Sequence, residues 1–568
     1  MTQYPPPNDY VPATLDASSW DVLEPLYKGL MDRPLSCSGC LESLLIDRSE
    51  LDAAASESGA NLYIDMTCHT DDESITKKFL DHVREVQPNL KEAGFQLDRR
   101  IVQCPHVDDL DKERYGVLIR NMEADVNLFR EENIPIQTKD TELGTKYDEI
   151  CGAMSVDFQG EEYTMPQMGK FLQDNDRSVR EGAWVATMNR RYQDHDAIDA
   201  IYDEMIEIRN QMALNADCED FREYMFKAMH RFDYTPADCE SFHQGVEKVC
   251  VPLQHAGNRN RRAEMGVDSL RPWDLEVDVK GRTPLVPFKD DAELVTKTSS
   301  LFHRMDSGLG EMFDRLRGGG CLDLDSRKGK APGGYQYNRD RTRIPFIFMN
   351  AAGLQRDVET MVHEAGHAFH SMLSEDDPLL AYRHSPIEFA EVASMSMELL
   401  AHPFLGEFYS EEEANRARRL HLEGVVNSLC WIATIDAYQH WIYTHPNHDR
   451  DQRDIYWLEL HARFGPDVDW SGYEAQRAKF WQKQLHLFGV PFYYIEYGIA
   501  QLGALQLWGQ YRRDPDKALA NYRKAMTLGG SRPLPELFEA AELRFDFGPG
   551  TMQLLMDDVQ EALAELPA

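Results

Sequence analysis

An HExxH pattern, His363-Glu364-Ala365-Gly366-His367, constrains this chain more than any other feature. On an α-helix, two histidines four residues apart lie one turn apart on the same face. Two imidazole nitrogens can then bind one Zn²⁺ at roughly 2.0–2.1 Å each. Glu364 lies beside the first histidine, where a carboxylate can accept a proton from a metal-bound water. The pattern therefore predicts zinc-assisted hydrolysis, most simply of a peptide bond, on a helical framework.

The residues around this pattern repeat with the period of an α-helix. Apolar side chains follow the spacing of a buried stripe, at Val358, Met361, Val362, Ala365, Phe369, Met372 and Leu373. Gly366 lowers helix propensity by about 1 kcal/mol relative to alanine, and it leaves room for another backbone or a substrate to come close. The alternative, a core helix with two hydrogen-bonded histidines, agrees less well with the adjacent glutamate and with the acids that follow.

A catalytic zinc needs a third protein ligand and an open position for water. The helical stretch from 386 to 400 offers Glu388, Glu391 and Glu398, which can share one face. The spacing alone does not separate Glu388 from Glu391 as the ligand. For Glu398, an ordinary solvated side chain is the favoured interpretation.

Four segments resemble the oligoendopeptidase F and thimet oligopeptidase family of zinc peptidases, with the oligoendopeptidase F branch closer. They read IPFIFMN (344–350), MVHEAGHAFH (361–370), FAEVAS (389–394) and PFYYIEYG (491–498), and weaker similarity runs from about residue 195 to the C-terminus. The resemblance implies that Glu391 is the third zinc ligand and that each chain binds one zinc ion. Glu388 then becomes a candidate for the acid that orients a histidine ligand through a hydrogen bond.

The same resemblance gives a catalytic role to the segment near the C-terminus. In the family, a histidine followed by two tyrosines binds substrate and stabilises the oxyanion that amide hydrolysis passes through. These residues map to His486, Tyr494 and Tyr497. The spacing from the histidine is one residue shorter than in the thimet branch, so Tyr493 stays open as the alternative to Tyr494. Without the resemblance, ordinary aromatic packing would be the preferred interpretation.

A glycine-rich loop at 327–335 precedes an apolar strand predicted at 344–349. Pro345 near the start of that strand favours an edge position in a sheet. An edge strand beside the zinc helix can pair with an extended peptide, and the family uses such a strand. The candidate substrate-binding residues are therefore Gly333, Gly334, Tyr335, Phe346, Ile347, Phe348 and Tyr493. The loop lacks the GxxxxGK[ST] arrangement of a nucleotide site.

The composition agrees with a globular enzyme that binds neither nucleic acid nor membrane. The 568 residues include 97 acidic and 60 basic side chains, and the formal charge of −37 repels nucleic acid and anionic lipid. No run approaches the ~18–20 apolar residues of a membrane span, and the first eight residues do not resemble a secretory signal. The ten cysteines form no framework, so a reducing, cytoplasmic location is expected. Cys37 and Cys40 form a lone CxxC, interpreted as two small core residues.

Most of the chain has helical patterning, so a mainly α fold is expected. The predicted helices lie near 76–94, 115–132, 177–214, 236–256, 291–316, 355–374, 386–400, 411–445, 472–487 and 493–512. Alternation around Gln159-Gly160 predicts a β-hairpin at 155–164. The resemblance implies a two-lobed helical body with zinc at the base of a deep channel and a small sheet beside the zinc helix. We place a soft boundary between an N-terminal helical region, 1–195, which forms part of the channel wall, and a catalytic region, 196–568.

Together these features predict a zinc-dependent endopeptidase that cleaves internal bonds of short unfolded oligopeptides, with Glu364 as the general base. Three alternatives remain: a helical zinc metallocarboxypeptidase, a non-catalytic zinc-containing peptide-binding protein, and a zinc hydrolase of a non-peptide amide. An intact Glu364 argues against the binding protein. The sequence predicts no oligomeric state.

Overall fold

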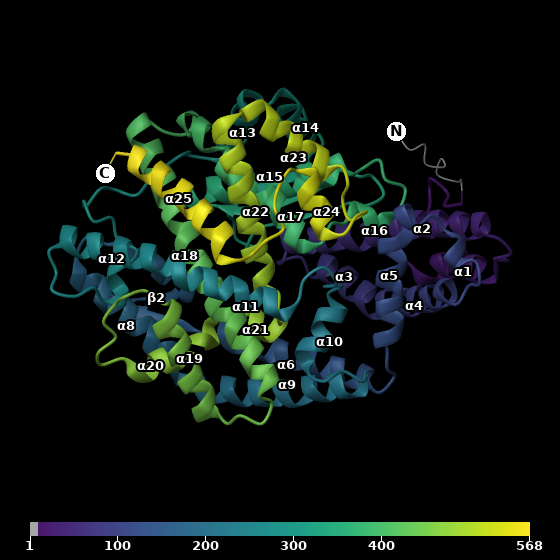
Figure 1. The fold of residues 1–568 in the computed structure, drawn as a ribbon, viewed down its shortest axis with the longest axis horizontal. Helices are drawn as coiled ribbons and strands as arrows, with labels where there is room; N and C mark the ends of the chain where they lie inside the picture. The colour runs from purple at the N-terminus through teal and green to yellow at the C-terminus, as the bar shows by residue number, and fades with distance from the viewer. Residues whose placement is uncertain (1–9, 568) are drawn as a thin grey trace. The chain divides into compact units, whose positions relative to one another are not determined.

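The computed structural model describes residues 10–567, and it is mainly α, as predicted (Figure 1). Residues 1–9, which include the segment inspected for a secretory signal, and residue 568 lie outside the described part. The chain divides into two compact units, one of 1–126, 285–418 and 500–545, the other of 127–284, 419–499 and 546–568. Three of the five boundaries fall inside helices, namely α5 (Lys112–Leu128), α18 (Glu411–Thr444) and α22 (Tyr494–Arg513). The boundary near residue 195 stays a prediction.

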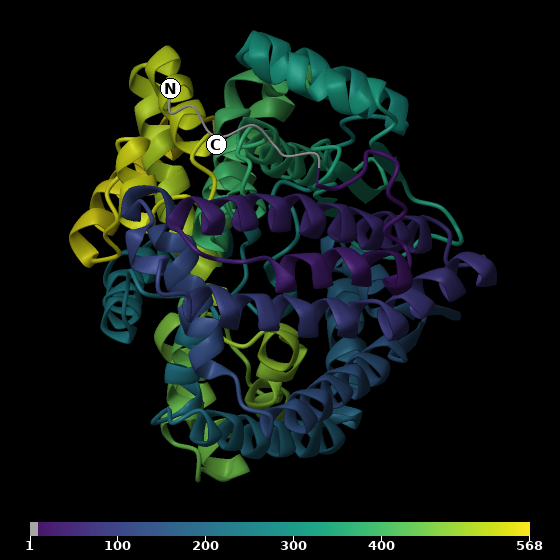
Figure 2. The same cartoon turned by 90° about the vertical axis from the view of Figure 1, so that its right-hand side faces the viewer.

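The first unit combines an N-terminal helical layer with the helices around the HExxH pattern. Its helices are α1 (Trp20–Asp32), α2 (Ser38–Cys68), α3 (Glu73–Glu85), α4 (Gln87–Val102), α13 (Asp291–Met305), α14 (Ser307–Gly318), α15 (Gln355–Leu373), α16 (Leu380–Arg383), α17 (Ile387–Leu400), α23 (Pro515–Met526) and α24 (Leu534–Ala540). Helices α1 to α4 pack side by side, which Figure 2 shows in purple and blue. In Figure 1, α15, α17 and α24 lie close together, and α17 packs against both neighbours.

Helix α15 carries the HExxH pattern and has the predicted apolar stripe. Val358, Met361, Ala365 and Phe369 are all buried, which confirms the periodicity. The helix follows a tight turn in which Gly353 has a φ of +85°, a conformation that glycine adopts without strain. In the first helical turn, Asp357 Oδ2 accepts hydrogen bonds from the backbone of residues 352 and 354, at 2.7 and 2.9 Å. This contact fixes the direction in which α15 leaves the sheet.

A three-stranded sheet precedes α15, in the order β3 (Leu322–Asp325), β5 (Phe346–Ala351), β4 (Tyr335–Tyr337). Strand β5 pairs in parallel with β3 and antiparallel with β4. The prediction that this apolar strand lies at an edge is therefore wrong, because β5 is central. Pro345 misled the prediction because it stands just before the strand begins and interrupts no ladder hydrogen bond. In the described part of the chain, β3 and β4 occupy the two edges of this sheet.

Helix α2 was not predicted from the sequence. Its buried residues lie on several faces, including Leu41, Leu44, Leu45 and Ile46, so the helix lacks a one-sided apolar period. Cys37 is the N-cap residue, and its sulfur accepts a hydrogen bond from Cys40 N at 3.2 Å.

The interpretation of Cys37 and Cys40 as core residues is wrong. Cys37 is exposed and Cys40 is half-buried. The start of a helix leaves backbone N–H groups unpaired, and a thiol at the cap position supplies one acceptor there.

The second unit is helical apart from one hairpin. Its helices are α6 (Asn133–Gly152), α7 (Met165–Met168), α8 (Arg177–Gln193), α9 (His195–Asn215), α10 (Phe221–Ala228), α11 (Pro236–Gly245), α12 (Val251–Met265), α19 (Arg450–Phe464), α20 (Glu474–Ala478), α21 (His486–Gly489) and α25 (Pro549–Glu565). Strands β1 (Ser155–Phe158) and β2 (Glu161–Thr164) pair antiparallel around Gln159-Gly160, as predicted. Among the described residues, none of the helices combines the length and apolar character that crossing a membrane requires.

Several predicted helices are divided in the structure. The segment 76–94 is split between α3 and α4, and the segment 472–487 becomes α20, a 3₁₀ turn and α21. The segment 177–214 breaks at Asp194 into α8 and α9, and the segment 291–316 breaks at Asp306 into α13 and α14. Asp306 has extended backbone and its carboxylate accepts a hydrogen bond from Leu309 N at 3.0 Å. An aspartate can end one helix and cap the next without disturbing the apolar period, so periodicity alone does not reveal the break.

Candidate metal centre and active site

The three predicted zinc ligands lie together, two on α15 and one on α17. The Nε2 atoms of His363 and His367 are 3.4 and 3.6 Å from Glu391 Oε2, and all three donor atoms lie within 4.8 Å of one another. Atoms bound to one tetrahedral zinc at about 2.0–2.1 Å lie roughly 3.3–3.4 Å apart. The two imidazoles and the carboxylate therefore fit one zinc ion with a fourth position left for another ligand.

Glu398 forms a direct contact that the sequence analysis missed. Its Oε1 lies 2.6 Å from His363 Nδ1, so the expectation of a solvated side chain is wrong. Burial lowers the pKa of His363, but the hydrogen bond to Glu398 and the charge of Glu391 raise it to about 10. The pocket thus strongly favours positive charge at this position. The signal was present in the sequence, because Glu398 follows Glu391 by seven residues, two turns along the same face.

The second histidine has a different partner. A ring nitrogen of His367 bonds the backbone carbonyl of Ala390, and burial lowers the pKa of His367 to about 4 despite the nearby charge of Glu391. A neutral imidazole is the form that binds a metal. Glu398 and the Ala390 carbonyl thus orient the two histidines, the role that the sequence analysis assigned to Glu388. Glu388 is buried one turn before Glu391, and any contribution to metal affinity stays a prediction.

The side chain of Glu364 is buried beside the three ligands. Burial raises the pKa of its carboxyl to about 7, with the charge of His363 and a hydrogen bond from the Gln336 backbone acting in the opposite direction. Gln336 belongs to β4, so the edge strand directly contacts the carboxylate. A carboxyl with a pKa near neutrality can both accept and return a proton, which suits a general base.

Gly366 allows α15 and α17 to meet backbone to backbone. A Cβ atom at this position would lie 2.6 Å from Ser394 Cα and 2.7 Å from Ala393 O. Ser394 is itself buried, and its hydroxyl donates to Glu391 Oε2 at 2.9 Å. The close approach therefore sets the separation between the histidines on one helix and the carboxylate on the other.

Substituting Gly366 with alanine should lower both stability and zinc affinity. The added methyl group gains about 1 kcal/mol of helix propensity, but overpacking against a backbone costs about 1–3 kcal/mol and pushes α17 away. Thermal unfolding and zinc titration measure the two effects. Gly424→Ala is the matched control. Gly424 lies in α18, and an added methyl group there would have no neighbour within 4 Å apart from the nearby backbone of its own helix. A Gly366→Ala protein as stable and as tightly zinc-bound as the Gly424→Ala protein would contradict this reasoning.

The predicted histidine and tyrosines gather in the second unit. The ring of His486 lies 4.8 Å from that of Tyr494, 6.1 Å from that of Tyr497 and 6.0 Å from that of Tyr493. All four side chains are partly exposed. The side chain of Gln484 fixes the histidine through a 2.7 Å contact with Nδ1. The cluster includes both candidate tyrosines, so geometry within this unit does not separate Tyr493 from Tyr494.

A strained turn orients these tyrosines. Phe492 has a φ of +66°, the left-handed region, which is unusual for a bulky residue. Its N–H donates to Gln439 Oε1 at 2.5 Å, and its carbonyl accepts from Arg231 at 2.6 Å. Arg231 also pairs with the buried Glu496 at 2.8 Å. Buried charges and an unfavourable backbone conformation tend to persist at functional sites, where the surrounding structure enforces them.

The other candidate substrate-binding residues are distributed over β4, β5 and the loop before β4. The side chains of Phe346, Ile347 and Phe348 are buried in the sheet. Gly333 has a φ of +100°, and a Cβ at Gly334 would lie 3.4 Å from the Phe348 carbonyl. Tyr335 stacks on Phe348 with ring centroids 4.8 Å apart. Side-chain recognition by β5 is therefore blocked, and the loop and β4 provide the accessible backbone.

Two of the three basic residues of the loop, Arg327 and Lys330, are paired with acids. Arg327 and Lys330 contact Asp323 at 2.5 and 2.7 Å. These ion pairs hold the pKa of the Asp323 carboxyl well below its usual range, even though burial acts to raise it. Their charges are thus neutralised within the protein, which agrees with the absence of a nucleotide motif.

Comparison with known proteins identifies the family. The model described as "Peptidase family M3" matches residues 170–549, and that described as "Peptidase M3 N-terminal domain" matches residues 17–129. An oligoendopeptidase F homolog of Borreliella burgdorferi is 23% identical over 474 residues, which cover 78% of this chain and 75% of the relative. Oligopeptidase PepF of Bacillus subtilis is 24% identical over 335 residues, 54% of this chain and 48% of the relative.

Solved structures show the same relationship along the whole chain. The structure of PZ peptidase A with inhibitor 2 has a TM-score of 0.89 at 26% identity, and covers 98% of this chain and 99% of its own. Oligoendopeptidase-F from Enterococcus faecium, at 15% identity and a TM-score of 0.62, covers 96% of each chain and shows the shared fold. The resemblance found in the sequence is confirmed: the chain belongs to peptidase family M3 and is a metallopeptidase.

Proposed function

We propose that this protein is a zinc-dependent endopeptidase that hydrolyses internal bonds of short unfolded oligopeptides. His363, His367 and Glu391 would hold one zinc ion per chain. The main support is the convergence of three donor atoms, with spacings of 3.4 and 3.6 Å from the Glu391 oxygen, beside a buried glutamate. The similarity to relatives named oligoendopeptidase F supports the choice of oligopeptides as substrates.

When bound, zinc would supply Lewis acidity and lower the pKa of a coordinated water towards ~7. Glu364 would accept the proton of the attacking water and return it to the leaving amine. Its burial among His363 and Glu391 keeps that carboxyl free of competing solvent. Glu398 would hold the Nδ1 proton of His363, which leaves the Nε2 lone pair for the metal.

We assign peptide binding to β4 and to the loop that leads into it. An extended peptide can add to an edge strand through backbone hydrogen bonds, which gives affinity with little dependence on sequence. Gln336 of β4 contacts the proposed base, so a peptide added here would run past Glu364. The deep channel implied by the family resemblance would exclude folded proteins, and it stays a prediction.

We assign the oxyanion donors to Tyr494 and Tyr497, with His486 as their neighbour. A hydroxyl that binds only the developing oxyanion should affect kcat more than KM. Tyr494→Phe and Tyr497→Phe should each lower kcat by about 10²–10³-fold, with zinc content unchanged, in steady-state assays on a quenched fluorescent peptide. Tyr493→Phe is the matched control and should be nearly silent. A large loss at Tyr493 with a silent Tyr494 would move the assignment by one residue, and silence at all three would leave aromatic packing as their role.

The function is tested with a mixed peptide library, analysed by mass spectrometry with and without a chelator. Internal cleavage that stops on chelation and returns with zinc is expected. Peptides with a blocked C-terminus separate the candidates, because an endopeptidase still cuts them and a carboxypeptidase does not. Retention of peptides without any cleavage would instead indicate a binding protein, and release of ammonia or amines from non-peptide amides alone would indicate a different hydrolase.

A further inference from the structure

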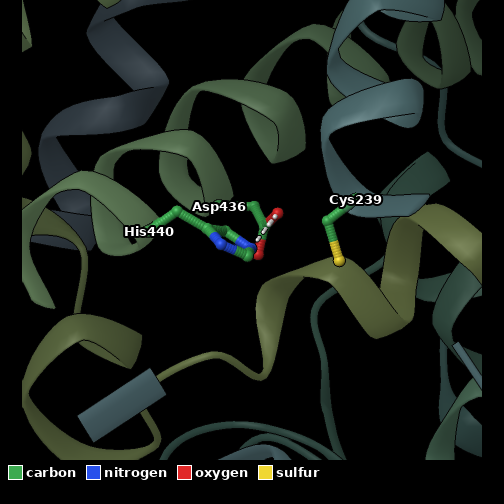
Figure 3. A group of neighbouring side chains, drawn as sticks. All are labelled: Cys239, Asp436 and His440. Carbon is green, nitrogen blue, oxygen red and sulfur yellow. Dashed lines mark ion pairs between the residues drawn. The ribbon is translucent and has the colours of Figure 1, made fainter. Parts of the chain in front are cut away.

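A second group of metal-binding side chains lies in the second unit, where α11 meets α18. Cys239 and His243 are one turn apart on α11, and Asp436 and His440 are one turn apart on α18. Figure 3 shows Cys239 approaching from one helix and the Asp436–His440 pair from the other. The donor atoms of Cys239, Asp436 and His440 all lie within 4.8 Å of one another. His243 is not a member of this set but lies beside it, and its Nε2 atom donates a hydrogen bond to Asp436 Oδ2 at 2.7 Å.

All four side chains are buried, with exposed fractions of 0% for Cys239, 0% for Asp436, 4% for His243 and 7% for His440. Two of their polar atoms, Asp436 Oδ1 and His440 Nε2, have no hydrogen-bond partner among the described residues. His440 Nε2 lies 3.3 Å from Asp436 Oδ2 without a hydrogen bond aligned along that line. A buried polar atom without a partner costs about 1–3 kcal/mol, and more where it carries charge. Both atoms belong to members of the donor set.

The donor set has the chemistry of zinc. Thiolate, imidazole and carboxylate are the ligands that zinc takes in tetrahedral sites, whereas magnesium and calcium prefer oxygen alone. We propose that Cys239, Asp436 and His440 bind a second zinc ion, which holds α11 against α18. His243 would orient the Asp436 carboxylate through its hydrogen bond. All three donor side chains are buried and come from two helices, so the ion would have a structural role away from solvent.

The surroundings are compatible with this occupant. Burial raises the pKa of the Cys239 thiol well above its ordinary value, an effect opposed by the nearby charge of Arg231. A bound divalent cation deprotonates a coordinating thiol and removes that cost. Arg222 Nη1 lies 3.5 Å from His440 Nδ1, the outer limit of a hydrogen bond. When His440 Nε2 binds zinc, Nδ1 carries the proton and cannot accept a hydrogen bond from Arg222. Arg222 is partly exposed and can turn instead towards Asp220, whose carboxylate is 3.8 Å away.

The alternative is a hydrogen-bonded cluster without metal, in which Asp436 is paired with His243 and His440. That cluster accounts for the 2.7 Å contact between His243 and Asp436. It does not use the Cys239 sulfur or satisfy Asp436 Oδ1. Zinc would also engage the Cys239 sulfur, so the two interpretations differ in whether that sulfur binds a metal.

Sulfur ligation distinguishes this site from the proposed catalytic centre, which has only nitrogen and oxygen donors. The full-length wild-type protein, saturated with zinc and dialysed, should contain two zinc ions per chain, and X-ray absorption should show a zinc–sulfur distance of about 2.3 Å. Cobalt-substituted protein should show a thiolate-to-cobalt charge-transfer band. Glu391→Ala should lose one metal and keep the band, even if the proposed peptidase mechanism is wrong.

Variants assign the sulfur to one residue. Cys239→Ser should remove the charge-transfer band and the zinc–sulfur signal, whereas Cys430→Ala should keep both. Cys430 is the matched control because it is a buried cysteine on α18 itself. Wild-type protein with one zinc per chain and no zinc–sulfur signal would overturn the proposal, and so would a band that survives in Cys239→Ser. The wild-type measurement decides the matter even if Cys239→Ser fails to fold.

Discussion

Replacing Glu364 with glutamine should remove nearly all peptide hydrolysis while the protein keeps its zinc. The amide has almost the same shape as the carboxylate but cannot accept a proton from water. General acid–base catalysis contributes about 10²–10⁴-fold, and Glu364 is proposed to act in both directions, so we expect kcat to fall near the upper end of that range. Steady-state kinetics on a short peptide, with zinc measured on the same sample, give both quantities.

Glu359→Gln is the matched control for this prediction. Glu359 lies on the same helix, one turn before His363, and its carboxylate accepts a hydrogen bond from Gln355 at 2.9 Å. Its substitution should leave kcat within a few-fold of wild type. If Glu364→Gln retained a normal kcat with full zinc occupancy, another group would have to be the base.

Replacing Glu391 with alanine should abolish activity through loss of the metal. The remaining two histidines cannot hold zinc against dialysis, and the buried site would lose the charge that balances a cation. Glu398→Ala removes an orienting partner and should weaken metal affinity by about 10–100-fold, with activity restored in excess zinc. Metal analysis after dialysis and a competitive chelator titration measure these effects.

The same experiment compares the three acids of α17. Glu388→Ala, whose role stays a prediction, should have a smaller effect than Glu398→Ala, because Glu398 is the acid in contact with His363. Full zinc retention by Glu391→Ala together with loss in Glu388→Ala would reverse the ligand assignment.

Helix α15 could be predicted from the sequence because its apolar pattern and its HExxH spacing have the same period. The apolar stripe of α15 has the period of a helix that is buried on one side, and the HExxH spacing repeats that period. Helix α2 gave no such signal, since it is buried on several faces. The breaks at Asp194 and Asp306 were equally hidden, because a helix can end at one residue without a change in the apolar pattern on either side. Only at Asp306 does the side chain cap the helix that follows.

The contacts of the site depended on tertiary structure that spacing does not encode. Glu388, Glu391 and Glu398 share a face of α17, and only the position of α15 shows that Glu398 meets His363. The central place of β5 was missed because β3 pairs with it from more than twenty residues earlier in the chain. The second group of metal-binding side chains, at Cys239 and Asp436, is formed by segments almost two hundred residues apart, so no local motif predicts it.

The contact at Gly366 has a consequence for how the site responds to losing its metal. The backbones of α15 and α17 are in direct contact here, with no side chain between them. No rotamer change can therefore alter the distance between the two helices. The ligand positions are thus a property of the helix pair rather than of the ion. Zinc would bind donor atoms that are already in place, so its binding would cost the protein little conformational entropy. We therefore expect zinc to be removed and rebound without refolding of α15 or α17.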